Sequence, residues 1–220
     1  MECSIETLYD LRETIAARLL EGAVYPWEAL PKIPAFILWL GERLPEEFFE
    51  ERGKGIWIAR DAEVAPSACL NGPLILDRKA QVRHCAYIRG GAVVGKEAVV
   101  GNSTELKNAV LFNKVQVPHY NYVGDSILGF RAHMGAGSVT SNVRSDKALV
   151  VVKGNGFAIE TGLKKVGAML GDQVEVGCNA VLNPGTVVGR NTDIYPASMV
   201  RGVVPADSIY KGAGKITEKR

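Results

Sequence analysis

The sequence is poor in the residues that mark several common functional classes. Aromatic residues make up only 7% of the chain, and its four cysteines show no CxxC pair or other metal-ligand spacing. Lysine plus arginine (26) nearly balances aspartate plus glutamate (24), which argues against a dedicated nucleic-acid binder. The longest apolar run, residues 35–40, is far shorter than the ~20 residues that span a bilayer. With no recognisable signal peptide, the sequence predicts a cytoplasmic protein without a metal centre.

An apolar residue recurs at every sixth position along the middle of the chain. The series is Ile58, Val64, Leu70, Leu76, Val82, Ile88, Val94, Val100, Leu106 and Phe112. The residue four positions later is small or apolar in every hexapeptide except the last, which has Gln116. A period of six fits neither an α-helix nor a single strand, but it fits a chain that turns a corner every six residues. The 24 glycines suit corners, where φ must often be positive.

This pattern is typical of a parallel β-helix, in which three hexapeptides form one triangular coil. We predict a mainly β protein of about seven coils, roughly 30 Å tall at ~4.8 Å per coil. An ordinary β-sandwich with fortuitous spacing is the alternative. The repeat slips by one near residues 117–123 and again at 128–134, and it disappears over about 141–165. We therefore assign residues 56–210 to the β-helix, with an inserted hairpin loop at about 141–165.

The segment 1–55 reads as a small helical cap. Ser4 is the expected N-cap of a helix with apolar residues at helical spacing, which Gly22 ends. Four prolines follow, and they leave room for a short helix over residues 35–43. We expect this segment to pack on the β-helix or on a partner subunit. At the other end, residues 211–220 form a basic tail.

Two cations are expected to stack on one face of the β-helix. Arg89 and Lys107 are separated by three hexapeptides, and each follows an inward aliphatic residue. They should therefore lie one coil apart, about 5 Å, on the same face. Two stacked cations beside a cleft suit an anion such as phosphate, although two solvated surface cations are the simpler interpretation.

His119 lies where the repeat slips, in the segment 117–125. Histidine is the side chain best suited to accept a proton near neutral pH, and a rigid repeat that changes register around it suggests a site. A surface histidine without such a role is the alternative.

The segment 134–142 combines glycine-rich backbone with the amide of Asn142, and it leads into the non-repetitive interval. An insertion in a repeat protein commonly builds a binding site. This insertion carries four lysines, and the apolar run 149–152 indicates one strand of a hairpin. The lysines are Lys147, Lys153, Lys164 and Lys165.

Four motifs together resemble a known family. They are residues 87–90 (Tyr-Ile-Arg-Gly), 104–108 (Thr-Glu-Leu-Lys-Asn), 118–125 (Pro-His-Tyr-Asn-Tyr-Val-Gly-Asp) and 135–142 (Gly-Ala-Gly-Ser-Val-Thr-Ser-Asn). Over about residues 58–205 the chain is similar to the acetyltransferase domain of bifunctional N-acetylglucosamine-1-phosphate uridyltransferase/glucosamine-1-phosphate acetyltransferase. It also resembles archaeal sugar-1-phosphate nucleotidyltransferases that carry this domain. The resemblance implies a left-handed β-helix that forms a homotrimer, with sites between subunits.

The resemblance also implies roles for individual residues. His119 matches the general base, which takes a proton from the sugar amine as that amine attacks acetyl-CoA. Asn142 matches a residue that supports the base. The residues implied to bind the amino-sugar phosphate are Arg89, Lys107, Tyr122, His133 and Lys147. Those implied to lie along acetyl-CoA, the cosubstrate, are Ala136, Cys178 and Pro196.

The chain departs from the family at several positions. Where the family has tyrosine, asparagine, serine and alanine, this sequence has Val143, His133, Cys178 and Pro196. The segment 1–55 is too short for a uridyltransferase domain and holds no Gly-rich phosphate loop, so we do not expect nucleotidyl transfer. A separate nucleotidyltransferase subunit is therefore a candidate partner.

Together these observations predict an acetyl-CoA-dependent N-acetyltransferase of UDP-N-acetylglucosamine biosynthesis, acting on a substrate like glucosamine-1-phosphate. One alternative is a non-catalytic module that binds a sugar phosphate or nucleotide sugar. Another is a zinc hydratase of the γ-carbonic anhydrase type, which shares the fold but needs three metal-binding histidines. The basic tail is expected to be a solvated terminus, with contact to the phosphates of CoA as the alternative.

Overall fold

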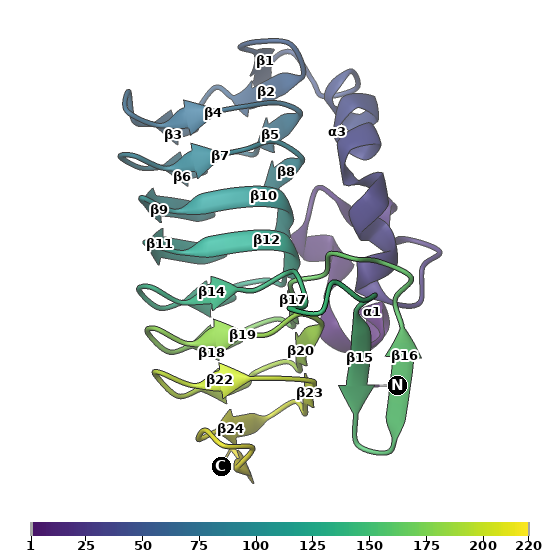
Figure 1. Ribbon diagram of the computed structural model, residues 1–220. Helices are drawn as coiled ribbons and strands as arrows, with labels where there is room; N and C mark the ends of the chain where they lie inside the picture. Colours follow the sequence, from purple (N-terminus) through teal and green to yellow (C-terminus); the bar gives the residue numbers. More distant parts are fainter. Residues whose placement is uncertain (1, 220) are drawn as a thin grey trace.

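A computed structural model describes residues 2–219 of the chain. Its main body is a left-handed parallel β-helix, which confirms the predicted fold class, with short strands stacked in a three-sided prism (Figure 1). Short helices of the N-terminal segment run along one side of this prism, and a two-stranded hairpin projects beside its lower coils. The C-terminus lies at the bottom of the stack.

The strands form three faces, which we number in the order the chain meets them. Within residues 2–219 the first two faces each contain eight strands, so our prediction of about seven coils was too low. The first face contains β2 (Ile56–Ala59), β5 (Leu74–Leu76), β8 (Ala92–Val94), the second halves of β10 (Glu105–Leu111) and β12 (Tyr122–Leu128), β17 (Ala168–Leu170), β20 (Thr186–Val188) and β23 (Val203–Val204). The second face contains β3 (Glu63–Val64), β6 (Gln81–Val82), β9 (Val99–Asn102), β11 (Gln116–His119), β13 (His133–Met134), β18 (Glu175–Val176), β21 (Asp193–Ile194) and β24 (Ser208–Tyr210). The third face contains β4 (Cys69–Leu70), β7 (Tyr87–Ile88), the first halves of β10 and β12, β14 (Val139–Thr140), β19 (Val181–Leu182) and β22 (Met199–Val200).

The register between coils explains the repeat and its slips. Leu106 stands opposite Ile88, a step of three full hexapeptides, but Leu111 stands opposite Val94, a step that is one residue shorter. The missing residue falls where β10 bends continuously from the third face into the first. The slip therefore begins at this corner, which is not the corner that carries His119. As a result Leu111, rather than Phe112, takes the inward apolar position of the repeat. Our sequence interpretation placed this break too late, around His119.

The insertion lies between the third and first faces and forms the predicted hairpin. The pairing of His133 with Glu175 closes a coil more than twice as long as an ordinary coil of three hexapeptides. The extra chain makes β15 (Val151–Gly154) and β16 (Phe157–Glu160), which pair antiparallel. We call the corner between the third and first faces the hairpin corner, because the hairpin starts there. The corner between the second and third faces, which carries His119, is the histidine corner.

Most corners use residues other than glycine, contrary to our expectation. Within residues 2–219, sixteen non-glycine residues have φ between 48° and 60°, including Tyr120 and Asp125. This conformation costs about 1–2 kcal/mol for an L-residue. The backbone hydrogen bonds between coils hold each corner in place, so the side chain at a corner is free to serve another purpose.

The N-terminal segment is broken into short helices rather than the predicted continuous helix. It contains α1 (Ile5–Leu8), η1 (Leu11–Glu13), α2 (Ala17–Leu20), η2 (Pro26–Lys32) and α3 (Ile33–Gly41). Tyr9 is extended and buried, and its hydroxyl donates a 3.3 Å hydrogen bond to the Ile127 carbonyl. Burial of Tyr9 against the prism therefore outweighs the local helical pattern. Helix α3 starts before residue 35 because Pro34 fits its first turn.

The N-terminal segment covers the first face. Helix α3 contacts β5, β8 and β10, and η2 contacts β12. All residues of β5 and β8 are fully buried as a result. The segment then returns through β1 (Phe49–Glu51), which pairs antiparallel with β2 at the start of the prism. The other two faces carry no such helical cover over the described residues.

The C-terminal tail folds into a strand, and most of its described residues are exposed to solvent. Its strand β25 (Ile216–Glu218) pairs antiparallel with β24 and covers the edge of the last coil. The Lys219 ammonium group lies 2.8 Å from the Asp193 carboxylate. In the part of the chain described here, no helix is long and apolar enough to cross a membrane.

The buried carboxylate of Asp172 ties the N-terminal segment to the prism. It accepts 2.8 Å hydrogen bonds from the backbone amides of Asp10 and Phe130. Its own amide donates to the Leu8 carbonyl at 3.0 Å. Asp172 is only 6% exposed, so its two amide donors have no ready access to water if the carboxylate is removed.

We expect Asp172→Ala to lower the free energy of unfolding by about 2–4 kcal/mol, because two amides lose their acceptor. Hydrogen exchange should accelerate most in residues 5–20. Asp61→Ala is the matched control, because this exposed carboxylate also accepts a backbone amide, that of Lys79; it should cost less than about 1 kcal/mol. Equal losses in urea denaturation would contradict the anchoring role of Asp172.

Candidate functional site

The register of the third face places the predicted site residues in vertical columns. Residues that follow the inward aliphatic position stand above one another at the hairpin corner. This column reads Arg89, Lys107, Gly124, Ser141, Asn183 and Arg201. The next column reads Gly90, Asn108, Asp125, Asn142, Pro184 and Gly202. The structure thus brings Arg89, Lys107 and Asn142 to one edge of the prism.

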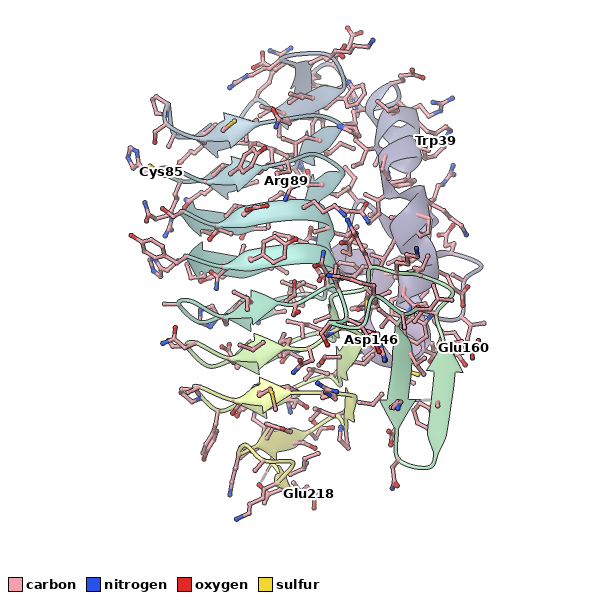
Figure 2. All side chains as sticks on the ribbon, viewed as in Figure 1. Trp39, Cys85, Arg89, Asp146, Glu160 and Glu218 are labelled. Carbon is pink, nitrogen blue, oxygen red and sulfur yellow. The ribbon has the colours of Figure 1, made fainter. Side chains whose placement is uncertain are left out.

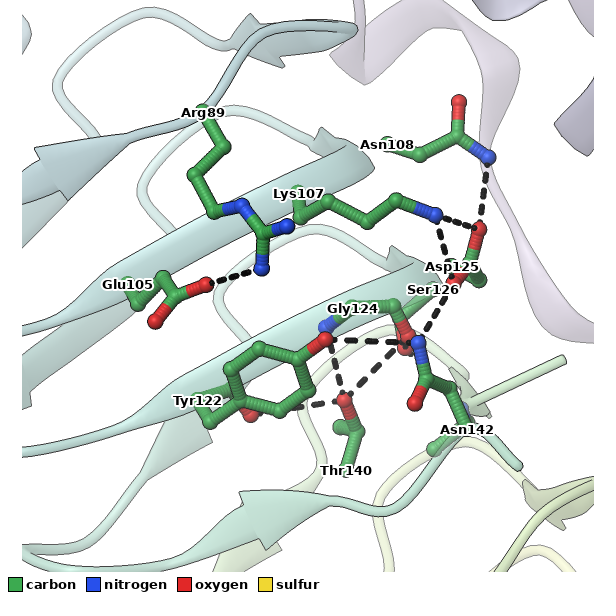
Figure 3. Close-up of polar contacts among 11 residues, drawn as sticks. Arg89, Glu105, Lys107, Asn108, Tyr122, Gly124, Asp125, Ser126, Thr140 and Asn142 are labelled. Atoms are coloured by element: carbon green, nitrogen blue, oxygen red, sulfur yellow. Dashed lines mark hydrogen bonds and ion pairs between the residues drawn. The ribbon is translucent and has the colours of Figure 1, made fainter. Parts of the chain in front are cut away.

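A polar cluster centred on Asp125 occupies this edge (Figure 3). The Lys107 ammonium group lies 2.8 and 3.0 Å from the two Asp125 carboxylate oxygens. The side-chain amide of Asn108 donates to the same carboxylate at 2.9 Å, and that of Asn142 donates to its other oxygen. The Asp125 side chain is 5% exposed. It is brought here by the bend in β12, where it has a φ of 48°.

Tyr122 adds a phenol to this cluster. Its hydroxyl accepts a 3.3 Å hydrogen bond from the Asn142 side-chain amide, which leaves the phenolic proton free to be donated elsewhere. Partial burial, and then the nearby Asp125 and Glu105 carboxylates, raise the pKa of Tyr122, so the phenol keeps its proton at neutral pH. Gly124 makes room for the ring, because a Cβ there would lie 2.4 Å from the Tyr122 hydroxyl.

The two stacked cations are each paired with a carboxylate, so the expected bare pair of positive charges is not present. Arg89 Nη1 lies 2.8 Å from Glu105, and Lys107 is paired with Asp125. The formal charges of these four side chains cancel. Arg89 is nevertheless 47% exposed, and it is held through one terminal nitrogen. Its other N–H groups can still donate to an anion.

The histidine corner gathers a second set of predicted residues. Its column reads His84, Asn102, His119, Ala136, Cys178 and Pro196. The predicted base therefore stands directly in line with the three residues implied to contact acetyl-CoA. Within residues 2–219 the exposed His119 imidazole makes no hydrogen bond.

Asn121 fixes the backbone of the histidine corner. Its Oδ1 accepts a 3.0 Å hydrogen bond from the His119 amide. Its side-chain amide donates to the carbonyls of Gly135 and Ser138, at 2.8 and 3.1 Å. At 2% exposure this side chain is buried between the two coils, so it sets the position of His119 relative to the Ala136 turn.

His133 and Lys147 lie apart from both columns. His133 is on the second face, where its Nδ1 lies 2.8 Å from Glu175. Lys147 is exposed on a turn of the insertion, with a φ of 58°. The turn is closed by the bidentate pair of Arg144 and Asp146. Within one chain the structure thus gives neither residue a place beside Arg89 and Lys107.

One full side of the prism separates His119 from Asn142 in a single chain. His119 ends strand β11 on the second face, and the third-face half of β12 lies between it and Asp125, so the two residues stand at opposite edges of the third face. Asn142 is one coil from Asp125 at the hairpin corner. Figure 2 shows the width of the third face, with Cys85 at one edge and Asp146 toward the other. Asn142 therefore cannot support His119 of the same chain.

Sequence reasoning missed the residues that organise both corners. Asp125, Glu105 and Asn121 received no role, although all three lie in the quoted motifs. The available signal was the spacing from Asn108 to Asp125, because it equals one coil of the shortened register in which Lys107 stands opposite Gly124. Among residues 2–219, no three His, Cys, Asp or Glu side chains are grouped so that they could hold a metal ion.

We expect Asp125→Asn to lower the free energy of unfolding by about 2 kcal/mol or more, because it leaves Lys107 unpaired in a partly buried cluster. Glu105→Gln removes a carboxylate from the exposed pair with Arg89 and should cost about 1 kcal/mol or less. Urea denaturation of the two variants checks this order. A larger loss from Glu105→Gln would contradict the central position of Asp125.

Comparison with known proteins gives one matching family model and partial relatives. The model of the GMPPB C-terminal domain matches residues 70–187. The bifunctional protein GlmU of Methanococcus vannielii is 35% identical over 136 residues, which are 61% of this chain and 33% of the relative. The bifunctional sugar-1-phosphate nucleotidylyltransferase/acetyltransferase of Sulfurisphaera tokodaii is 31% identical over 166 residues, 76% of this chain and 41% of the relative.

These curated relatives are much longer, since the chain spans only about a third to two-fifths of their lengths. A solved structure, the UDP-N-acetylglucosamine acyltransferase of Arabidopsis, is 16% identical, and the match covers 73% of each chain with a TM-score of 0.34. The family model covers more than half of the chain, including both corner columns from Lys107 to Cys178. The chain therefore belongs to the family of the GMPPB C-terminal domain.

Proposed function

We propose that this chain is an acetyl-CoA-dependent N-acetyltransferase that acts on an amino-sugar 1-phosphate at sites between the subunits of a homotrimer. One observation carries the proposal: the residues implied for the reaction divide between two corners of one face. Base and acetyl-CoA residues line the histidine corner, whereas Arg89, Lys107 and Asn142 line the hairpin corner. Neither corner is complete alone, but a neighbouring prism could bring its opposite corner alongside.

The surface between the two corners supports this assembly. The outward column of the third face reads Cys69, Tyr87, Glu105, Tyr122, Val139, Val181 and Met199. Below Tyr122 the column is apolar, and Val181 and Met199 are 38% and 64% exposed. A second copy of the chain would bury these side chains and place the partner's His119 near Asn142.

The chemistry of each corner fits acetyl transfer to an amine. The Asn142 amide nitrogen is used by Asp125 and Tyr122, which leaves its Oδ1 to accept a ring N–H from the partner's His119. That hydrogen bond leaves the other ring nitrogen free to take a proton. The sugar amine attacks the thioester carbonyl, the imidazole takes the amine proton, and the departing CoA sulfur receives it.

The remaining residues bind the substrates in this proposal. Arg89 donates to the sugar phosphate with the N–H groups that Glu105 does not use, and Tyr122 donates its phenolic proton. Ala136, Cys178 and Pro196 flank the pantetheine arm along the histidine corner. Supporting this assignment, the GlmU and sugar-1-phosphate nucleotidylyltransferase/acetyltransferase relatives share this part of the chain. A cytoplasmic location stays a prediction.

His119→Ala should lower turnover by about 10²- to 10⁴-fold, because the general base is lost. The measurement is thiol release from acetyl-CoA with glucosamine-1-phosphate, and with galactosamine-1-phosphate as a second acceptor. His84→Ala is the matched control, since His84 occupies the same column two coils away, and it should keep the wild-type rate. Wild-type turnover in His119→Ala would exclude His119 as the base. Binding of the sugar phosphate without thiol release would favour a non-catalytic module.

Met199→Glu combined with Val181→Glu should separate the trimer into monomers, because both charges would fall in the buried contact. Analytical ultracentrifugation measures the state, and thiol release should fall with the trimer. Val24→Glu is the control, since Val24 is 57% exposed on the N-terminal segment and should leave assembly unchanged. Active monomers would contradict sites formed between subunits.

A further inference from the structure

A pocket of about 390 Å³ lies at the hairpin corner, between the inserted segment and the lower coils. Its lining includes Ser141, Arg144, Lys153, Asn183 and Arg201. Three of these, Ser141, Asn183 and Arg201, continue the column that begins with Arg89 and Lys107. The acetyl-transfer reaction proposed above gives this pocket no role.

The hairpin that forms one wall of the pocket is firmly docked. Val150 and Val152 are fully buried against the prism. The hairpin approaches two glycine corners so closely that no side chain would fit. A Cβ on Gly185 would lie 2.7 Å from Val150, and one on Gly202 would lie 2.6 Å from the Lys153 carbonyl oxygen. The pocket is therefore preformed, with the Lys153 backbone held against Gly202, the residue after Arg201.

The pocket is positively charged. In the part of the chain that the structure describes, neither Lys153 nor Arg201 forms an ion pair. Arg144 is paired with Asp146, whose pKa is lowered by the hydrogen bonds from Arg144, so that carboxylate stays ionised. Three cations and one carboxylate leave a formal charge of +2, whereas the cluster of Arg89 and Lys107 is neutral.

The donors suit a ligand with more than one phosphate group. A guanidinium group can bind two phosphate oxygens at once, and an ammonium group binds a phosphate as a point charge. The Ser141 hydroxyl adds a further donor. Arg201 lies four coils below Lys107 in the register, about 19 Å away. A sugar phosphate bound at Lys107 cannot span that distance, so a different group must occupy the pocket.

We propose that this pocket binds the diphosphate group of a nucleotide-containing ligand, with Arg201 and Lys153 as its principal contacts. Two sources share this chemistry, coenzyme A and a nucleotide sugar. The assignment of coenzyme A as the ligand rests on the proposed acetyl transfer. The binding of a diphosphate group does not, because it can be measured without any reaction.

Calorimetry of the full chain with inorganic pyrophosphate at low ionic strength tests the pocket directly. Arg201→Gln and Lys153→Gln should each weaken binding about tenfold, because each removes a charge-assisted contact. Lys54→Gln, an exposed lysine near the opposite end of the prism, should bind as the wild type does. Thermal unfolding checks that all variants are folded. No binding by the wild type, or unchanged binding by the first two variants, would overturn the proposal.

Competition against pyrophosphate then distinguishes the sources. Displacement by coenzyme A but not by uridine diphosphate assigns the pocket to the acyl donor, and the reverse assigns it to a nucleotide sugar. If neither displaces pyrophosphate, the proposal of a nucleotide-containing ligand is wrong. If the wild type binds pyrophosphate but releases no thiol, only the proposal of acetyl transfer is wrong. The two proposals can therefore fail separately.

Discussion

Each coil of the β-helix must stack directly on its neighbour, because the backbone amides of every short strand find their acceptors one coil away. Within such a strand there is no other partner for these groups, and buried backbone groups without partners are costly. The inward aliphatic residues fill the axis only when this stacking is kept. One consequence is that residues far apart in sequence stand in fixed vertical columns. Arg89, Lys107 and Arg201 share a column for this reason, as do His119, Ala136 and Cys178.

The functional features arise where stacking is kept but the corner changes. At the hairpin corner β10 and β12 lose one residue and bend continuously, which brings Asn108 and Asp125 together beside Lys107. One coil below, the same corner gains the hairpin and with it a pocket lined by three cations. At the histidine corner the backbone is instead fixed by the buried Asn121. The two corners therefore offer different chemistry on one rigid scaffold.

The six-residue period predicted the coils, the insertion and the alignment of Arg89 with Lys107, because each follows from strand stacking alone. It did not predict the broken N-terminal helices, since burial of Tyr9 against the first face is a long-range contact. Nor did it predict that the two cations would be paired, because Glu105 and Asp125 reach them from neighbouring coils. The separation of His119 from Asn142 could in principle have been inferred from the sequence. His119 lies one hexapeptide before Asp125, and Asn142 lies one coil after Asp125. The resemblance implied sites between subunits, and within one chain the two residues lie at different corners of the third face.

Mixed trimers of His119→Ala and Asn142→Ala test this central claim most directly. Each variant alone should lack thiol release from acetyl-CoA, because every site has lost one of its two groups. After subunit exchange, verified by mass, about a quarter of the sites should combine an intact His119 with an intact Asn142 from another chain. Thiol release should then return to about a quarter of the wild-type rate. If exchange is complete and no activity returns, His119 and Asn142 do not act together across a subunit interface.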